Sequence, residues 1–274
     1  DAPCEEPVRP TLIPSTRVVP EASLVQEAAG LLATAERPVV FVGDGVAYSG
    51  AQAELTRVAE LLGAEVWDAD AGEVNIDERH PLYQGMTGHM FGEHSLPLLS
   101  KGDANLVVGT YIVPEVFPHL GDVWGAGAKV VHIDLNAYEI GKNHPVDIGV
   151  VADPKLTLAL LADALERTMS GQAKQAARAR LEAARQAKQE QHEAAMKADR
   201  ELRDAVPVRM SRFMEELAAH LPSGTVVFDE ALTSSPAVSR YLAPSRTGEY
   251  FLTRGGSLGV GFPGGIGVKL ANPD

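Results

Sequence analysis

Apolar and polar positions over residues 21–170 alternate between two kinds of pattern. Pro38–Val42 is a short, continuous apolar run, which is typical of a strand buried on both faces of a parallel sheet. Comparable runs predict further strands at 64–67, 105–109, 129–133 and 147–151. Helical or irregular segments separate these runs. The alternation predicts βαβ units and an α/β fold, a Rossmann-like parallel sheet flanked by helices.

Several segments between the strands carry helix signals. Apolar positions within residues 24–32 recur at i, i+4, i+7 and i+8, and Arg37-Pro38 ends this helix. A second helix is predicted over about residues 50–63. Asp153-Pro154 places an N-cap and a first-turn proline before another apolar-periodic stretch. We therefore expect residues 21–170 to form one complete central α/β domain.

The pattern changes after residue 170. Residues 171–205 contain many Ala, Gln, Lys, Arg and Glu and few large apolar side chains, so helix propensity is high. Positions a and d are not filled over successive heptads, which favours a solvated connecting helix over a coiled coil. A new amphipathic helix and a strand at 225–228 follow. Residues 206–274 are fewer than the ~100 of a complete α/β domain, so we expect the beginning of a second one.

Composition limits the classes of function that remain open. Lys+Arg number 24 and Asp+Glu 37, and the net charge of −13 argues against a nucleic-acid partner. The single cysteine, Cys4, allows no internal disulfide and no cysteine-based zinc site, which is compatible with a cytoplasmic location. Apolar runs stay below the roughly 18 residues of a membrane span, so no membrane partner is expected.

Both ends of the sequence predict a piece of a longer protein. Residues 1–20 carry five prolines without periodicity and read as an extended interdomain linker. The chain does not begin with Met, and it stops at the turn-like Asn272-Pro273-Asp274.

Residues 253–267 are the most informative segment. They hold seven glycines in fifteen residues, a density that permits positive φ angles and close approach of a ligand to the backbone. Pro263 then suits the first turn of a helix. A glycine-rich loop that enters a helix is a geometry used for cofactor binding, although flexibility alone would give the same composition.

The order of motifs resembles the thiamine diphosphate-dependent decarboxylases and synthases, the family of benzoylformate decarboxylase and acetolactate synthase. A strand is followed by Asp229–Ser235, by about twenty residues, and by the glycine-rich loop with its proline and helix. The resemblance extends upstream to the segments 38–45, 131–136, 139–143, 146–147 and 151–153. It implies a central domain and the beginning of a diphosphate-binding domain.

The resemblance also implies roles for individual residues. Thr233 and Ser234 match positions that meet the diphosphate, with capping of the next helix as the alternative. Gly256, with Ser257 beside it, matches a backbone contact to the aminopyrimidine. Leu258 matches the bulky residue between the two cofactor rings, with core packing as the alternative. Glu230 is expected close to the cofactor.

Two features depart from the family pattern. Its Mg²⁺ motif is Gly-Asp-Gly followed by Asn-Asn, but Gly43-Asp44-Gly45 lies in the central domain and the sequence contains no Asn-Asn pair. We therefore read Asp44 as a turn residue and expect the metal ligands, and the glutamate that activates the cofactor, outside this chain. No catalytic residue is assigned within it.

Other polar clusters favour no site. His89 and His94 are five residues apart, which does not place both on one helix face, so surface or loop positions are expected. Asp68, Asp70 and Glu73 are expected to be solvated. Gly43–Gly45 lacks the G-x-G-x-x-G spacing, so FAD is not expected in the central domain.

These observations predict the function of the whole protein. We expect thiamine diphosphate-dependent decarboxylation of a 2-oxo acid, with the cofactor as electron sink, in a homodimer or homotetramer. An acetolactate synthase-like carboligase is the alternative within the family. A nucleotide-binding or purely structural α/β module, with its ligand at Gly43–Gly45, is the alternative of another class. The 274-residue chain alone is expected to be inactive.

Overall fold

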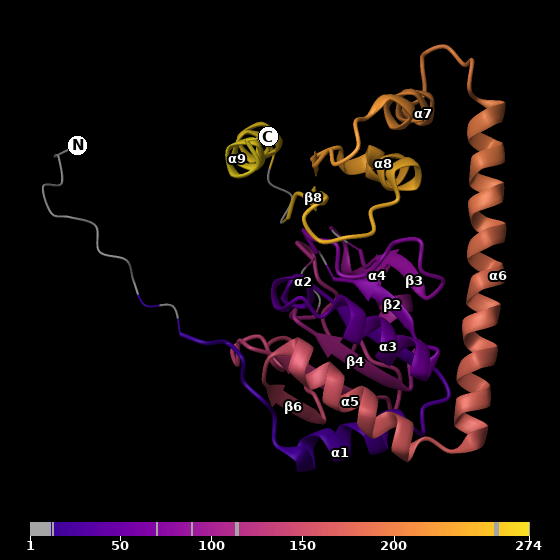
Figure 1. The fold of residues 1–274 in the computed structure, drawn as a ribbon. Coiled ribbons are helices and arrows are strands. Elements are labelled where there is room, and N and C mark those ends of the chain that lie inside the picture. The colour runs from indigo at the N-terminus through magenta and orange to yellow at the C-terminus, as the bar shows by residue number, and fades with distance from the viewer. Residues whose placement is uncertain are drawn as a thin grey trace, which may run out of the picture.

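A six-stranded, fully parallel sheet forms the centre of the first half of the chain (Figure 1). The computed structural model describes residues 12, 14–69, 71–88, 90–112, 115–254 and 258–273. The strand order is β3-β2-β1-β4-β5-β6, which confirms the predicted Rossmann-like sheet. The strands are β1 (Pro38–Val42), β2 (Glu65–Asp68), β3 (Tyr83–Met86), β4 (Ala104–Val108), β5 (Lys129–Asp134) and β6 (Ile148–Val151).

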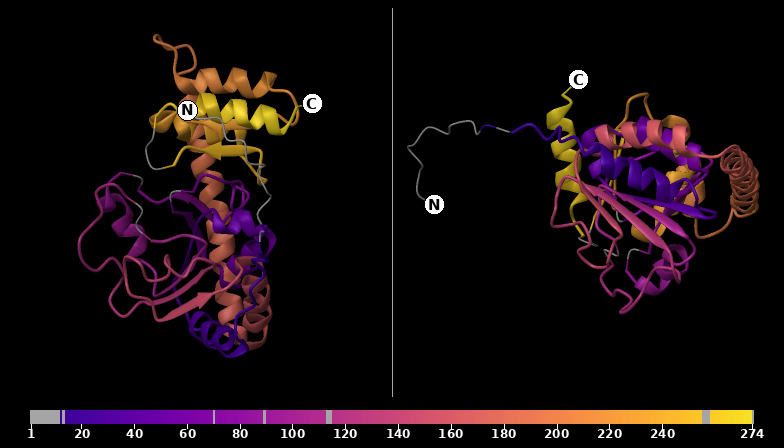
Figure 2. Two further views of the ribbon diagram at one scale, coloured as in Figure 1. Left: turned by 90° about the vertical axis from the view of Figure 1, so that its left-hand side faces the viewer. Right: turned by 90° about the horizontal axis from the view of Figure 1, so that it is seen from below.

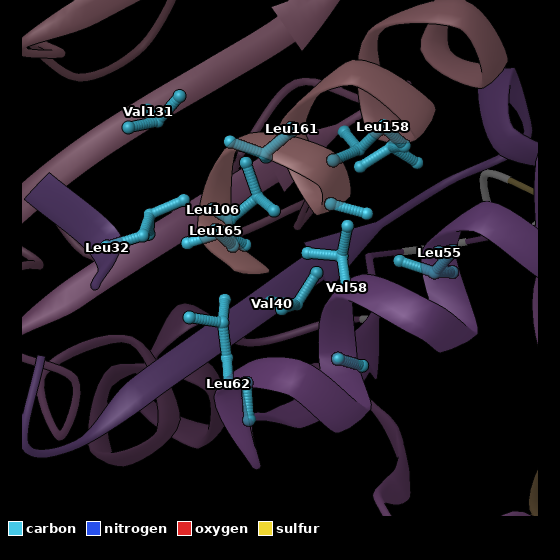
Figure 3. Packing of buried hydrophobic residues seen from close by; sticks show 14 of the residues in the cluster. Leu32, Val40, Leu55, Val58, Leu62, Leu106, Val131, Leu158, Leu161 and Leu165 are labelled. Atoms are coloured by element: carbon cyan, nitrogen blue, oxygen red, sulfur yellow. The ribbon is translucent and has the colours of Figure 1, made fainter. Parts of the chain in front are cut away.

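Helices cover the sheet because its central strands are apolar on both faces. The helices of this half are α1 (Ala22–Leu32), α2 (Gly45–Ser49), α3 (Gln52–Leu62), α4 (Gly92–Leu99) and α5 (Pro154–Thr168). Helices α1, α3 and α5 pack together on one face, and Figure 3 shows their side chains beside those of the strands. Leu158, Leu161 and Leu165 of α5 are each at most 1% exposed. Burying one such side chain stabilises the fold by about 1.5–3 kcal/mol.

Local signals explain where the helices begin and end. The Asp153 carboxylate accepts a hydrogen bond from Leu156 N at 2.9 Å, and Pro154 opens α5, as predicted. The helix predicted over about residues 50–63 is confirmed as α3, and a further short helix, α2, precedes it. Gly50 has a φ of 66°, in the left-handed region, and ends α2 before α3 begins at Gln52.

The long helix α6 (Gly171–Glu201) runs along one edge of the molecule and connects its two halves (Figures 1 and 2). Arg180 donates hydrogen bonds to the carbonyl oxygens of Leu62 and Gly63, at the end of α3. Lys188 Nζ donates to the carbonyl oxygens of Glu78, His80 and Tyr83 at 2.5, 2.9 and 2.7 Å. Most of the helix is exposed, as predicted for a connecting helix.

The C-terminal half is a second, smaller α/β unit. Its elements are α7 (Met210–His220), β7 (Val227–Asp229), the 3₁₀ turn η1 (Leu232–Ser234), α8 (Ser235–Leu242), β8 (Tyr250–Leu252) and α9 (Gly261–Ala271). Strands β7 and β8 are parallel, and α8 lies on the connection between them. Figure 2 shows this unit above the six-stranded sheet.

The loop over residues 71–80, called the junction loop below, joins the two halves. Leu252 N donates to Gly72 O at 2.9 Å, and Glu78 N donates to Pro244 O at 3.0 Å. Val74 is buried in an apolar cluster with Met214, Val238 and Tyr250 of the C-terminal unit. The loop therefore contributes both backbone hydrogen bonds and core contacts to the junction.

Asp68 differs from the sequence-based expectation that it is solvated. Its side chain is buried and accepts hydrogen bonds from Asn75 Nδ2 at 3.0 Å and Tyr83 Oη at 2.9 Å. Burial raises the pKa of the Asp68 carboxyl to about 7. The expectation was wrong because Asp68 is the last residue of β2, where its side chain enters the core beneath the junction loop.

Candidate cofactor site

A short polar turn follows strand β7 and leads into helix α8. Thr233 and Ser234 lie in the 3₁₀ turn η1, with Thr233 exposed and Ser234 half-buried. Leu232, the first residue of this turn, has a φ of 50°, which is unusual for a residue with a Cβ. The turn places two hydroxyl groups beside the N-terminus of α8, where backbone N–H groups favour an anion.

The hydroxyl groups of this turn do not cap the helix. Ser234 is the N-cap residue of α8, but its side chain makes no capping hydrogen bond. Ser235, the first residue of α8, has a buried Oγ without a hydrogen-bond partner among the described residues. An unpaired buried hydroxyl costs free energy unless a ligand or water satisfies it. The capping alternative is therefore wrong for Ser234, and Ser235 joins the site.

Asp229 at the end of β7 supports the turn. It is 4% exposed, its Oδ1 accepts from Ala231 N at 2.6 Å, and its Oδ2 accepts from the Tyr250 hydroxyl of β8. Burial and the bond to Asp229 raise the pKa of Tyr250 above its ordinary value, so its hydroxyl remains protonated and donating. These contacts hold the start of the turn relative to both strands.

Glu230 contacts the backbone of the glycine-rich segment. Its two carboxylate oxygens accept hydrogen bonds from Gly259 N and Gly261 N, next to the start of α9. A carboxylate at a helix N-terminus is favoured by the helix dipole. The structure therefore brings Glu230 to the glycine-rich segment. Gly256 and Ser257, the other residues expected in this segment, lie outside the described residues.

Leu258 is 72% exposed, so the alternative that it packs in the core is wrong. Its side chain is accessible to a ligand. Helix α9 behind it packs closely on β7, because a Cβ on Gly264 would lie 2.5 Å from the Phe228 ring. Apolar side chains are also exposed along α9, at Phe262, Ile266 and Leu270.

The backbone N–H groups of Gly43 and Gly45, the alternative ligand site, are hydrogen-bonded to the protein itself. Gly43 N and Gly45 N donate to the carbonyl oxygens of Val108 and Gly109, at the point where the strand order reverses. A Cβ on Gly45 would lie 2.5 Å from Gly109 Cα, so the two loops touch backbone to backbone. These N–H groups are not offered to a phosphate.

Asp44 is more than the turn residue that the sequence predicts. Its carboxylate accepts from Gly72 N, Glu73 N and Arg254 Nη1 at 2.8, 3.0 and 3.0 Å. It thereby links the turn after β1 to the loop over residues 71–80 and to Arg254, at the start of the glycine-rich segment. Sequence reasoning missed the partner because Arg254 is 210 residues away.

The described residues contain no group of three or more His, Cys, Asp or Glu side chains that could hold a metal ion. His94 is among the described residues, whereas His89 and Asp70 lie outside the described residues. Glu73, which was expected to be solvated, is half-buried, and desolvation raises its pKa. In the same described part of the chain, no helix is long and apolar enough to cross a membrane.

Sequence comparisons identify relatives of the chain. The chain is 29% identical over 259 residues to the "Probable acetolactate synthase large subunit" of Methanococcus aeolicus, a match that covers 91% of this chain and 42% of that protein. It is 28% identical to the "Sulfoacetaldehyde acetyltransferase" of Rhodobacter capsulatus, covering 94% of this chain and 46% of that protein. The chain therefore spans less than half of the length of these relatives.

Structural comparisons find the same fold. Benzoylformate decarboxylase from Polynucleobacter necessarius aligns with a TM-score of 0.74 and 20% identity, over 99% of this chain and 47% of that one. The 4-hydroxybenzoylformate decarboxylase from Rhodococcus jostii aligns with a TM-score of 0.71 and 21% identity, over 96% and 46%. The family profile "Thiamine pyrophosphate enzyme, central domain" matches residues 25–161. The chain thus belongs to the thiamine pyrophosphate enzyme family.

Proposed function

We propose that this chain is part of a thiamine diphosphate-dependent enzyme that decarboxylates a 2-oxo acid. In this proposal, residues 1–20 are an interdomain linker, 21–170 the central domain, 171–205 a connecting helix and 206–274 part of the diphosphate-binding domain. The observation that carries the proposal is the hydroxyl cluster after β7. Its buried, unpartnered Ser235 Oγ lies at the start of α8, in a chain of this family.

The donor set of this cluster fits a diphosphate. Thr233, Ser234 and Ser235 supply three hydroxyl donors beside a helix N-terminus, which is a favourable place for an anion. The exposed Leu258 offers an apolar surface to the cofactor rings. When bound, thiamine diphosphate supplies an electron sink for cleavage of the C–C bond next to a carbonyl.

The remaining contacts are proposed from the family resemblance. Gly256 and Ser257 would contact the cofactor, and Glu230 would act by holding the backbone of Gly259 and Gly261. The Mg²⁺ ligands and the activating glutamate would come from outside this chain, in a cytoplasmic homodimer or homotetramer. The chain itself would bind and orient the diphosphate.

The reaction itself has two candidates. Structural neighbours named as benzoylformate decarboxylases favour decarboxylation, whereas relatives named as acetolactate synthases favour carboligation. The complete gene product is to be incubated with benzoylformate or pyruvate, with and without thiamine diphosphate and Mg²⁺. We expect cofactor-dependent CO₂ release with benzaldehyde from benzoylformate; acetolactate from pyruvate would instead identify the carboligase. Turnover without added or bound cofactor would refute both.

Two further measurements test the boundaries of the proposal. The purified 274-residue chain is expected to release no CO₂ from either acid, and measurable release would contradict the expectation that it is inactive alone. Calorimetry with FAD, ADP and NAD tests the alternative of a nucleotide-binding module. We expect no heat, because the N–H groups of Gly43 and Gly45 are bonded to protein carbonyl oxygens.

A further inference from the structure

Asp44 lies where the two halves of the molecule meet. Its side chain is 5% exposed and accepts three hydrogen bonds. Oδ1 accepts from Gly72 N and Glu73 N, and Oδ2 accepts from Arg254 Nη1 at 3.0 Å. Because the carboxylate is buried, removal of its charge-assisted partner Arg254 would leave it with only two backbone N–H donors.

Arg254 lies at the start of the glycine-rich segment. It follows β8, whose Leu252 N donates to Gly72 O at 2.9 Å, and Thr253 N donates to Asp229 O at 3.0 Å. The Arg254 side chain packs closely against Gly72, since a Cβ on Gly72 would lie 3.1 Å from both Cγ and Cδ of Arg254. The junction loop therefore holds the backbone of β8 and the side chain of Arg254 together.

We propose that Asp44 is a positioning residue for the start of the glycine-rich segment, at Thr253 and Arg254, beside the proposed cofactor site. Its ion pair with Arg254 ties this start to the loop after β1, while Glu230 accepts hydrogen bonds from Gly259 N and Gly261 N farther along the segment. The effect on the cofactor rests on the proposed function; the mechanical coupling does not. The placement of Thr253 and Arg254 thereby depends on a residue in the turn between β1 and α2.

The coupling is tested first in the 274-residue chain without cofactor. Amide hydrogen exchange at Thr253, Gly259 and Gly261 is compared among Asp44→Asn, Arg254→Gln and the double variant. We expect exchange to be about tenfold faster in each single variant, as for loss of one charge-assisted hydrogen bond. The double variant should exchange no faster than the singles, because both remove the same contact.

Asp147→Asn is the matched control. Asp147 also accepts from one cation, Lys129 Nζ at 2.6 Å, and from a backbone N–H, that of Val130, but it lies at the start of β6. It should leave the three amides unchanged. Arg254 has a side chain that is 45% exposed, so Arg254→Gln keeps the test valid if Asp44→Asn fails to fold. Unchanged exchange in Arg254→Gln would overturn the proposal.

The second measurement is the Kd of thiamine diphosphate for the complete gene product. Faster exchange together with a Kd raised about tenfold in Arg254→Gln supports the proposal, and Arg254→Lys should recover part of the affinity. Faster exchange with an unchanged Kd would overturn the positioning role. If the unmodified protein binds no thiamine diphosphate, the proposed function fails, whereas the exchange result still decides whether Asp44 holds the segment.

Discussion

Asp68 offers a sharp test of the electrostatics at the junction. Its carboxyl group is buried at the end of β2, between Asn75 and Tyr83. The substitution Asp68→Asn keeps the size and shape of the side chain. The new amide oxygen would accept from Asn75, and the new amide N–H would donate to the Tyr83 oxygen, so both contacts survive while the titratable group is removed.

The magnitude follows from the pKa of Asp68. Burial raises it from 3.8 to about 7, which corresponds to about 4 kcal/mol of differential stability. Between about pH 4 and pH 7 the unfolded chain loses this proton and the folded chain retains it. The contribution of Asp68 is therefore neutral below about pH 4, becomes increasingly unfavourable as the pH rises, and is fully unfavourable above about pH 7.

The free energy of unfolding is measured by urea denaturation at about pH 5 and about pH 8 for the wild type and Asp68→Asn. We expect the difference between variant and wild type to shift by up to about 3 kcal/mol in favour of the variant at the higher pH. Asp147→Asn should not shift this way, because hydrogen bonds from Lys129 and a backbone N–H outweigh burial and lower the Asp147 pKa. The same change in the free energy of unfolding between the two pH values for Asp68→Asn and the wild type would refute the reasoning.

Three further predictions test packing and the connecting helix. Leu161→Ala should lower the free energy of unfolding by about 2–5 kcal/mol in urea, whereas Leu160→Ala, at a 39% exposed position, should cost less than about 1 kcal/mol; equal losses would contradict the assigned core. Gly264→Ala should lower the Tm because its Cβ would meet the Phe228 ring. Gly265→Ala, with open space around the position, should raise the Tm, and the reverse order of the two Tm values would contradict the packing of α9 on β7. Lys188→Met should destabilise by about 2–3 kcal/mol through three lost hydrogen bonds, and an unchanged urea midpoint would show that these bonds do not hold α6.

The regular elements follow from local patterns in the sequence. The apolar runs at β1, β4 and β5 mark strands because both faces of these strands are covered, whereas β6, at the edge of the sheet, alternates buried and exposed residues. Strand β3 (Tyr83–Met86) has no such run, since three of its four residues are only half-buried at the edge of the sheet. The break between α2 and α3 depends on the φ of Gly50, which periodicity alone does not reveal.

The sequence predicted site residues only where those residues are neighbours along the chain. Thr233 and Ser234 stand out as hydroxyl residues after a strand, and Ser235 beside them could have been chosen on the same ground. Asp44 and Arg254 meet through tertiary packing over 210 residues, so no spacing rule indicates their contact. The burial of Asp68 likewise depends on a loop that folds back over its strand.

The central claim is that the hydroxyl cluster of this chain binds the diphosphate of thiamine diphosphate. Calorimetric titration of thiamine diphosphate with Mg²⁺ into the complete gene product, with Ser235 intact or replaced by alanine, tests it directly. Because Ser235 Oγ has no partner among the described residues, Ser235→Ala should leave the fold stable. The account predicts saturable binding that is weakened about tenfold or more in Ser235→Ala, as for loss of one hydrogen bond to a charged group. Absence of binding, or an unchanged affinity in the variant, would contradict it.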